Sequence, residues 1–279
     1  MRVVIDSNRV QSEELERFLA SAPGHRAVVT DWLMMEAYKG DTQRSIYKSL
    51  GVLAKFPRQV IVLRNTGICM CRRVGPQMAS RLIWDEHTRT FPRFISEIAD
   101  AQAGNALIEQ SLFWRGEKAS ERMEALMDIA DLLMDGHRSM SAVLTSRNIA
   151  AIRTNKDVPT DILKRVFEIS DSVSQGFREQ IDGSVPHERG KRFGDDFLFR
   201  VGIGVTASFL EWVRTGSPPI IKAAKVRNDH VDSMLAVFGT YFNGVMSGDR
   251  RLQRIHLLSR KLLQNRGVIL PPMYNASSP

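Results

Sequence analysis

The sequence predicts an α/β fold, and three observations support this prediction. Short β-branched runs alternate with amphipathic helical periods at both ends of the 279-residue chain. Acidic residues follow several of these runs directly, as residues do at the carboxyl edge of a parallel sheet. Apolar residues make up 43% of the chain, which suffices for a packed core, so global disorder is not expected.

The first part of the chain, residues 1–67, shows strand and helix patterns in alternation. Short apolar runs predict strands at Val3–Ile5, Ala27–Val29 and Gln59–Leu63. Amphipathic stretches predict a helix capped by Ser12, a second capped by Thr30 or Asp31, and a longer one from Thr42 to just before Pro57.

The middle of the chain, residues 68–219, nearly lacks strand-like runs and shows long helical periods instead. Helix starts are expected at Pro92, Ser120 and Thr160, and Asp195 precedes an apolar segment that runs to Val213. We therefore predict an all-helical insertion or subdomain here.

The α/β pattern returns in residues 220–270. A helix is expected from Lys225 to Phe242, then a short strand from Gly244 to Ser247, then a helix led by Asp249. The two ends of the chain are thus predicted to complete one sheet, and residues 271–279 to form a flexible tail.

The composition and net charge of the chain indicate which binding partners and which cellular compartment to expect. Lys and Arg number 39 against 31 Asp and Glu, a formal charge of +8, which favours a polyanionic partner such as nucleic acid. Cys69 and Cys71 are too close for an ordinary disulfide and are expected to be reduced. The absence of a signal-peptide pattern and of a bilayer-spanning apolar stretch predicts a cytoplasmic protein that does not engage a membrane.

The candidate site is a set of acids at opposite ends of the sequence. Asp6 follows the first strand directly, and Asp249 follows the last one. Glu36, Asp229 and Asp232 lie between them on expected helices. Several acids converging at one sheet edge would hold a divalent metal ion.

Each acid also has an ordinary structural explanation. Asp6 suits an Asx turn or a cap, and Asp249 suits the N-cap of its helix. Asp229 or the residue before it could cap a helix, with Asp232 favoured by the helix dipole. Glu36 could be a solvated helical residue. The argument for a metal site therefore depends on the placement of the acids together.

In order and context these acids resemble those of the PIN-domain superfamily of metal-dependent nucleases. The matching features are Val3-Val-Ile-Asp6-Ser-Asn8, Glu36 on the second helical element, Asp232 on the penultimate helix, and Val245-Met-Ser-Gly-Asp249-Arg, with 17 residues from Asp232 to Asp249. The resemblance covers about the first 66 and last 60 residues. It implies a three-layer fold with a central parallel sheet, interrupted here by the large all-helical insertion.

The resemblance also implies an activity, a cofactor and partners. It implies hydrolysis of a phosphodiester without a protein nucleophile, with RNA favoured over DNA, in a toxin or defence effector that an inhibitor or antitoxin protein could control. The catalytic residues would be Asp6, Glu36, Asp232 and Asp249. With Asp229 as an accessory ligand, they would hold Mg²⁺ or Mn²⁺, hard cations that prefer carboxylate oxygens.

Polar residues around the acids are candidates for substrate binding: Asn8, Arg227, Arg250, Arg251 and Arg254. The arginines would contact phosphates, which adds affinity but little sequence selectivity. A solvated helix face explains any one of them equally well, and Asn8 could instead cap a turn.

A second class of function stays open, namely a nucleic-acid-binding or protein-interaction module with the same scaffold and no catalysis. Other chemistries lack support, because the histidines show no ligand spacing and neither a Walker lysine nor a Gly-x-Ser-x-Gly motif occurs. The Met-rich stretch from Met123 to Met134 leaves a homo-oligomer open, although a core role is favoured for it.

Overall fold

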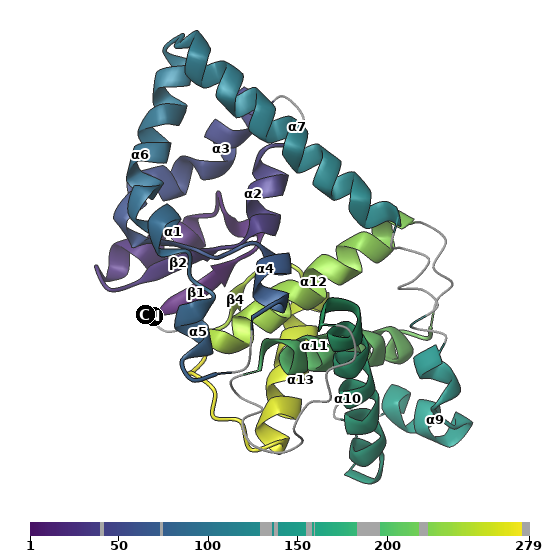
Figure 1. Cartoon of the computed structure of the whole chain (residues 1–279). Coiled ribbons are helices and arrows are strands. Elements are labelled where there is room, and N and C mark those ends of the chain that lie inside the picture. Colours follow the sequence, from purple (N-terminus) through teal and green to yellow (C-terminus); the bar gives the residue numbers. More distant parts are fainter. Residues whose placement is uncertain are drawn as a thin grey trace.

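The structure is a computed structural model that describes residues 1–39, 42–72, 75–128, 136, 139–154, 158, 160–182, 196–217 and 223–274. Its centre is a parallel four-stranded sheet in the order β3-β2-β1-β4 (Figure 1). The strands are β1 (Arg2–Ile5), β2 (Arg26–Val29), β3 (Val60–Val62) and β4 (Val245–Met246). The predicted α/β class and the parallel sheet are confirmed, as is the union of the two ends of the chain.

The register of the sheet sets the position of the candidate site. Ile5 of β1 lies opposite Met246 of β4, so the next residues along, Asp6 and Ser247, also come side by side. On the other side of β1, Val4 pairs with Val28 of β2. The carboxyl ends of these strands therefore meet at one edge of the sheet.

Five described helices connect the first three strands. They are η1 (Ser7–Arg9), α1 (Glu13–Ser21), α2 (Asp31–Ala37), α3 (Thr42–Lys55) and η2 (Pro57–Gln59). Both expected caps are confirmed: the Ser12 hydroxyl accepts a hydrogen bond from Leu15 N at 3.2 Å, and the Thr30 hydroxyl accepts one from Leu33 N at 3.3 Å.

The Ser12→Ala substitution is expected to lower the free energy of unfolding by about 1 kcal/mol, the usual effect of losing an N-cap. Ser12 also donates to Arg9 O at 2.7 Å, so the hydroxyl fixes the turn that enters α1. Urea denaturation measures the change. Ser12→Asp keeps a capping oxygen and should stay within about 0.5 kcal/mol of wild type; equal losses in both variants would contradict a capping role.

The middle of the chain is helical in every element that the structure describes there, apart from an isolated bridge between Leu63 and Ile83. Its helices are α4 (Thr66–Met70), α5 (Met78–Arg81), α6 (Asp85–Gln102), α7 (Ala106–Asp128), α9 (Ser146–Thr154), α10 (Thr160–Asp182) and α11 (Phe197–Arg214). The helices α12 (Ala223–Tyr241) and α13 (Arg250–Asn265) flank β4.

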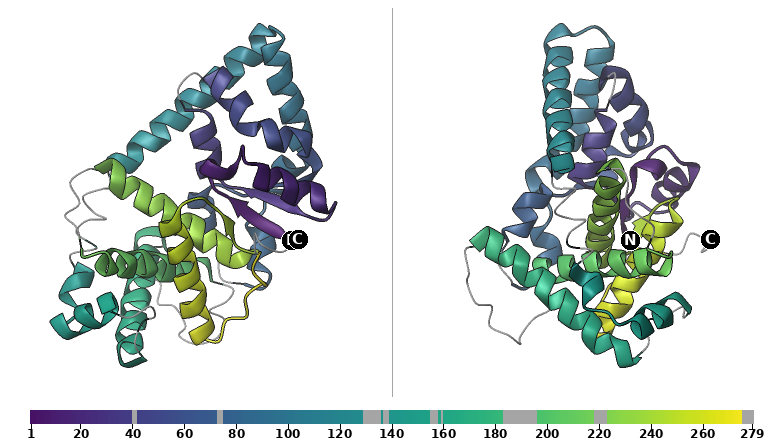
Figure 2. Two further views of the ribbon diagram at one scale, coloured as in Figure 1. Left: turned by 180° about the vertical axis from the view of Figure 1, so that it is seen from behind. Right: turned by 90° about the vertical axis from the view of Figure 1, so that its right-hand side faces the viewer.

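These helices form two groups on either side of the sheet's carboxyl edge. The hairpin of α6 and α7 packs against α2, α3 and β3, whereas α10 to α13 pack mainly on one another (Figure 2). One continuous hydrophobic cluster runs through both groups and the sheet. Among the described helices, none combines the length and the apolar character that a bilayer-crossing segment requires.

Two predicted helix starts are wrong. The helix α6 begins at Asp85 and carries Pro92 in its interior, since buried Phe91 and Ile98 hold it against the fold despite the missing N–H. The helix α7 begins at Ala106 and not at Ser120. Its first half exposes large apolar side chains, which obscures the amphipathic period that marks a helix. Met123 packs against the core as expected, while Met134 falls outside the described residues.

Candidate functional site

Four aspartates from both ends of the sequence surround the ends of β1 and β4. Asp6 follows β1 directly, and Asp249 is the N-cap residue of α13. Asp229 and Asp232 lie on α12, a helix that contacts β1, β4 and α13. The sheet edge thus gathers carboxylates that lie up to 243 positions apart in the chain.

Ser247 links two of the aspartates. Its hydroxyl donates to Asp6 Oδ2 at 2.5 Å and accepts a hydrogen bond from Asp249 N at 2.9 Å. Asn8 supports the same turn, because its Oδ1 accepts from Gly248 N at 2.9 Å. The segment after β4 is therefore fixed to the segment after β1 by polar contacts as well as by strand pairing.

Arg251 links the other two aspartates to the site. Its Nη1 donates to Asp229 Oδ1 at 2.6 Å and to Asp232 Oδ2 at 3.3 Å, and its Nη2 donates to Ser208 Oγ of α11 at 3.3 Å. The backbone N of Arg251 also donates to Asp249 Oδ1 at 2.5 Å. One arginine in the first turn of α13 thus contacts three of the four carboxylates.

The aspartates act electrostatically on one another. Burial raises the pKa of Asp232 to about 7; Arg251 lowers it, and the charges of Asp249, Asp6 and Asp229 raise it further. Burial also raises the pKa of Asp6, against a lowering by the Ser247 hydrogen bond. The pKa of Asp229 is likewise raised by burial and lowered by Arg251. The site therefore holds more negative charge than Arg251 neutralises.

The donor set suits a hard divalent cation in its chemistry, since it consists of carboxylate oxygens. The carboxylates are not arranged as a formed chelate, however. Within the described part of the chain, no three Asp, Glu, His or Cys side chains lie close enough to share one ion. The Arg251 guanidinium lies between Asp229 and Asp232, at the place where a cation would relieve their repulsion.

The structure tests whether Asp249 and Asp229 serve as helix caps. Asp249 does cap its helix, since its Oδ1 accepts from Arg251 N and Leu252 N. Asp229 does not cap α12, because that helix already begins at Ala223. Its carboxylate and that of Asp232 lie one turn apart on the same face of the helix, and Arg251 bridges them.

Glu36 differs from the aspartates. It lies in the last turn of α2, an element that contacts η1. No side-chain hydrogen bond or ion pair joins Glu36 to any other residue that the structure describes. Its membership in the site stays a prediction.

The proposed substrate-binding residues have different environments. Arg254 Nε forms an ion pair with buried Glu211, and Arg227 hydrogen-bonds to its neighbour Asn228. Arg250 is exposed, with no hydrogen bond or ion pair inside the described ranges. Asn8 and Arg251 are engaged within the site, as described above. Of the four arginines, Arg250 is thus the one placed for phosphate contact without rearrangement.

Three residues near the site were not among the predicted ligands. Ser247 and Ser208 hold the site through their hydroxyls. Asp31 follows β2 after one intervening residue and accepts hydrogen bonds from Thr66 N and Oγ1, both at 2.8 Å. Burial raises its pKa. The strand-end rule that selected Asp6 would also have found Asp31 and Ser247, whereas Ser208 carries no sequence signal of this kind.

The histidine beside Asp229 is not placed as a general base. Burial lowers the pKa of His230 to about 4, so its ring is neutral at physiological pH and poorly basic. The ring packs edge-on against Trp32 of α2 with centroids 6.2 Å apart. His230 therefore contributes packing between α12 and α2.

Comparison of the chain with protein-family models, with curated proteins and with solved structures finds no match in any of the three.

Proposed function

We propose that this protein is a metal-dependent nuclease with a PIN-like site, and that RNA is favoured over DNA as its substrate. The supporting observation is that Asp6, Asp229, Asp232 and Asp249 lie around the carboxyl edge of the sheet, near enough for the charges of the other three to raise the pKa of Asp232. The resemblance noted above adds the reaction class and a role as a cytoplasmic toxin or defence effector under control of an inhibitor protein.

Each acid has a distinct role in this proposal. Asp6, Asp232 and Asp249 hold Mg²⁺ or Mn²⁺, Asp229 assists as an accessory ligand, and Glu36 completes the set, directly or through water. A bound ion of this kind supplies an activated water and stabilises charge on the phosphate. Ser247 orients Asp6 through its 2.5 Å hydrogen bond, as residues behind a metal ligand commonly do.

Arg251 has a double role in the same proposal. In the structure it neutralises Asp229 and Asp232. If Asp229 and Asp232 held a divalent cation, the Arg251 guanidinium would be free to donate to a phosphate oxygen. Arg250, at the start of α13, and Arg227, near the start of α12, would guide the phosphate backbone of the nucleic acid toward the acids.

A second candidate function has its own supporting observation. Because Arg251 satisfies two of the aspartates and Asp249 caps α13, the cluster can also be a structural network in a module that binds nucleic acid or protein without catalysis. Such a module would bind its partner equally well with and without chelator.

The test is cleavage of an end-labelled single-stranded RNA, with a DNA strand of the same sequence in parallel, in Mg²⁺, Mn²⁺ or EDTA. The nuclease proposal expects metal-dependent products that EDTA abolishes, with RNA cut faster than DNA. An intact substrate in both metals, with purified folded protein in excess over the strand, would reject the nuclease and leave the binding module.

A further inference from the structure

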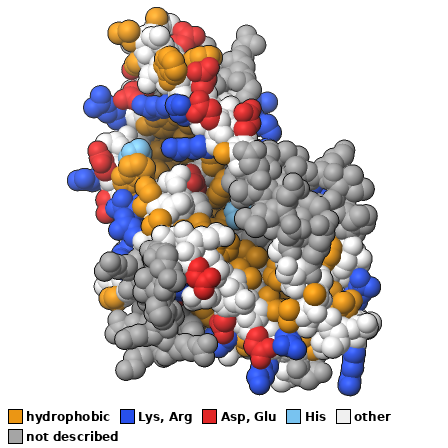
Figure 3. Space-filling model, turned by 45° about the vertical axis from the view of Figure 1, so that its right-hand side comes forward, with side chains coloured by type: hydrophobic (Ala, Val, Ile, Leu, Met, Phe, Trp, Pro, Cys, Tyr) orange, Lys and Arg blue, Asp and Glu red, His pale blue; other side chains and the backbone are white. Residues whose placement is uncertain are grey.

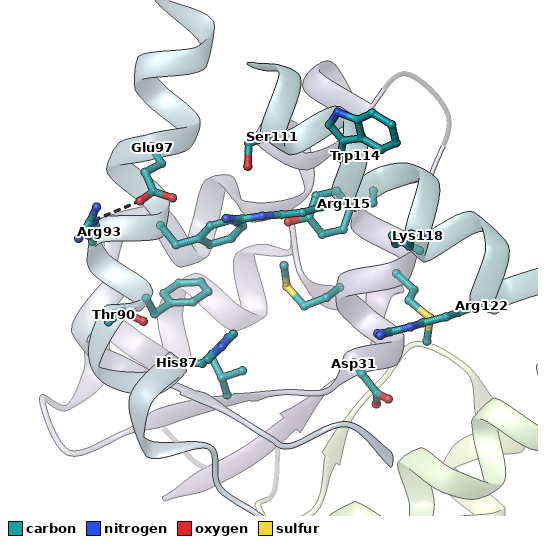
Figure 4. Close-up of a pocket in the computed structure, with 17 residues that line it drawn as sticks. Asp31, His87, Thr90, Arg93, Glu97, Ser111, Trp114, Arg115, Lys118 and Arg122 are labelled. Atoms are coloured by element: carbon teal, nitrogen blue, oxygen red, sulfur yellow. Dashed lines mark hydrogen bonds and ion pairs between the residues drawn. The ribbon is translucent and has the colours of Figure 1, made fainter. Parts of the chain in front are cut away.

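A second site lies between α2, α6 and α7. The structure shows a cavity of about 790 Å³ there, within the range of small-molecule sites. Figure 4 shows the labelled side chains of α6 and α7 around it, with Asp31 at its lower end in this view. None of the four site aspartates lines it.

Part of the cavity lining is apolar and includes flexible methionine side chains. It is formed by Met34 and Met35 of α2, Phe91 and Phe94 of α6, and Trp114 of α7. Trp114 is 57% exposed, although burying an indole would stabilise the fold. Thioethers and aromatic rings adapt to flat aromatic ligands, which stack on them.

The helix α7 also contributes a row of cations to the lining. Arg115, Lys118 and Arg122 recur at helical spacing and all line the cavity. Lys118 is engaged by Glu121 at 2.7 Å, and the Arg115 guanidinium lies 5.6 Å from the Phe94 ring centroid. Arg122 forms no hydrogen bond or ion pair within the part of the chain that is described.

The acids of the cavity do not neutralise this row. Glu97 is paired with Arg93 at 3.1 Å, and Asp31 is then the other acid in the lining, against Arg115, Lys118 and Arg122. The net charge of the cavity lining is therefore positive, which favours binding of an anion. Blue basic, red acidic and orange hydrophobic side chains intermingle over the upper part of the molecular surface in this view (Figure 3).

The cavity opens at the same sheet edge as the four aspartates. Since Val4 pairs with Val28, Asp6 aligns with Thr30, and Asp31 of the cavity is the next residue. The aspartates thus lie past β1 and β4, while the cavity lies past the neighbouring strands β2 and β3.

We propose that this cavity binds an unpaired nucleotide of a single-stranded nucleic acid, with the base against Trp114 and the Met and Phe side chains, and the phosphate at Arg122. The inference rests on the proposed function in one respect: the nucleic-acid strand that the cavity holds is the same strand that the aspartate site cuts. Binding by the cavity is separable from cutting, because none of its lining residues is a proposed metal ligand.

The test is fluorescence anisotropy of a labelled 12-nucleotide single-stranded RNA in EDTA, where cutting cannot occur. Trp114→Ala is expected to weaken binding about fivefold or more, the lower range for loss of one base stack. Phe113→Ala is the matched control, because Phe113 is 56% exposed on the same helix and does not line the cavity. It should bind as wild type does.

The phosphate contact has its own readout in the salt dependence. Arg122→Gln should reduce the slope of log Kd against log salt by about 0.7, the value for one contact to a single strand. Arg89→Gln, an exposed arginine of α6 outside the cavity, should leave the slope unchanged. A blunt RNA duplex should bind more weakly than the strand, since its bases are not free to enter.

The outcomes separate the two proposals. Equal binding by Trp114→Ala and Phe113→Ala, or equal slopes for both arginine variants, overturns the cavity as a nucleotide site even if the protein cuts RNA. No binding of the wild type in EDTA overturns it as well. Loss of binding in Trp114→Ala and Arg122→Gln alone supports it, even if no metal brings about cleavage.

Discussion

Asp249→Asn is expected to lower the rate of Mg²⁺-dependent RNA cleavage about 10³-fold, equivalent to ~4 kcal/mol of transition-state stabilisation. The substitution is selective because asparagine is as good an N-cap as aspartate. The hydrogen bonds to Arg251 N and Leu252 N, which start α13, can persist. The carboxylate charge is lost, and with it a ligand for the ion. Single-turnover cleavage measures the effect, and thermal unfolding checks the fold.

The control is Asp85→Asn, the same change at an exposed acid in the first turn of α6, for which wild-type cleavage is expected. Asp6→Asn should match Asp249→Asn in its loss. If Asp249→Asn cuts RNA at the wild-type rate while its unfolding temperature is unchanged, Asp249 is a cap and no more, and the metal site as proposed is wrong.

Local patterns were sufficient to predict the sheet. The β-branched runs and the Ser12 and Thr30 caps lie where the sequence places them, because each depends on residues within one turn or one strand. The start of α6 was missed because it lacks a polar cap. Trp84 precedes α6 and makes no side-chain cap, so Pro92 looked like the better start although packing carries the helix through it.

The candidate site was predictable in part for the same reason. Position past a strand identifies Asp6, and position at a helix start identifies Asp249, since both are local properties. The role of Arg251 is different, because its bridge joins residues of α12 and α13 whose side-chain directions depend on how the helices pack. The cavity between α2, α6 and α7 likewise arises from packing of distant segments, so no spacing in the sequence indicates it.

Asp232→Asn is expected to stabilise the metal-free protein at pH 8, and to stabilise it by clearly less at pH 5. The pKa of Asp232 is raised to about 7 in the folded protein, with burial as the largest cause, so the folded state binds a proton more tightly than the unfolded chain does. Stability due to this group therefore falls as pH rises from about 4 to about 7 and stays low above that. Asparagine resembles the protonated form and avoids the loss, a gain on the order of 2 kcal/mol at pH 8.

Urea denaturation in EDTA at the two pH values measures this difference, with Asp85→Asn as the control for a solvated carboxyl. The outcome also distinguishes the two functions. Burial of the Asp232 carboxylate, and after it repulsion by Asp249, Asp6 and Asp229, give the pH-dependent gain, and a bound divalent cation would offset both costs. Destabilisation by Asp232→Asn of similar size at both pH values would mean that the pair with Arg251 at 3.3 Å holds the fold together, as expected for a structural network in a module without catalysis.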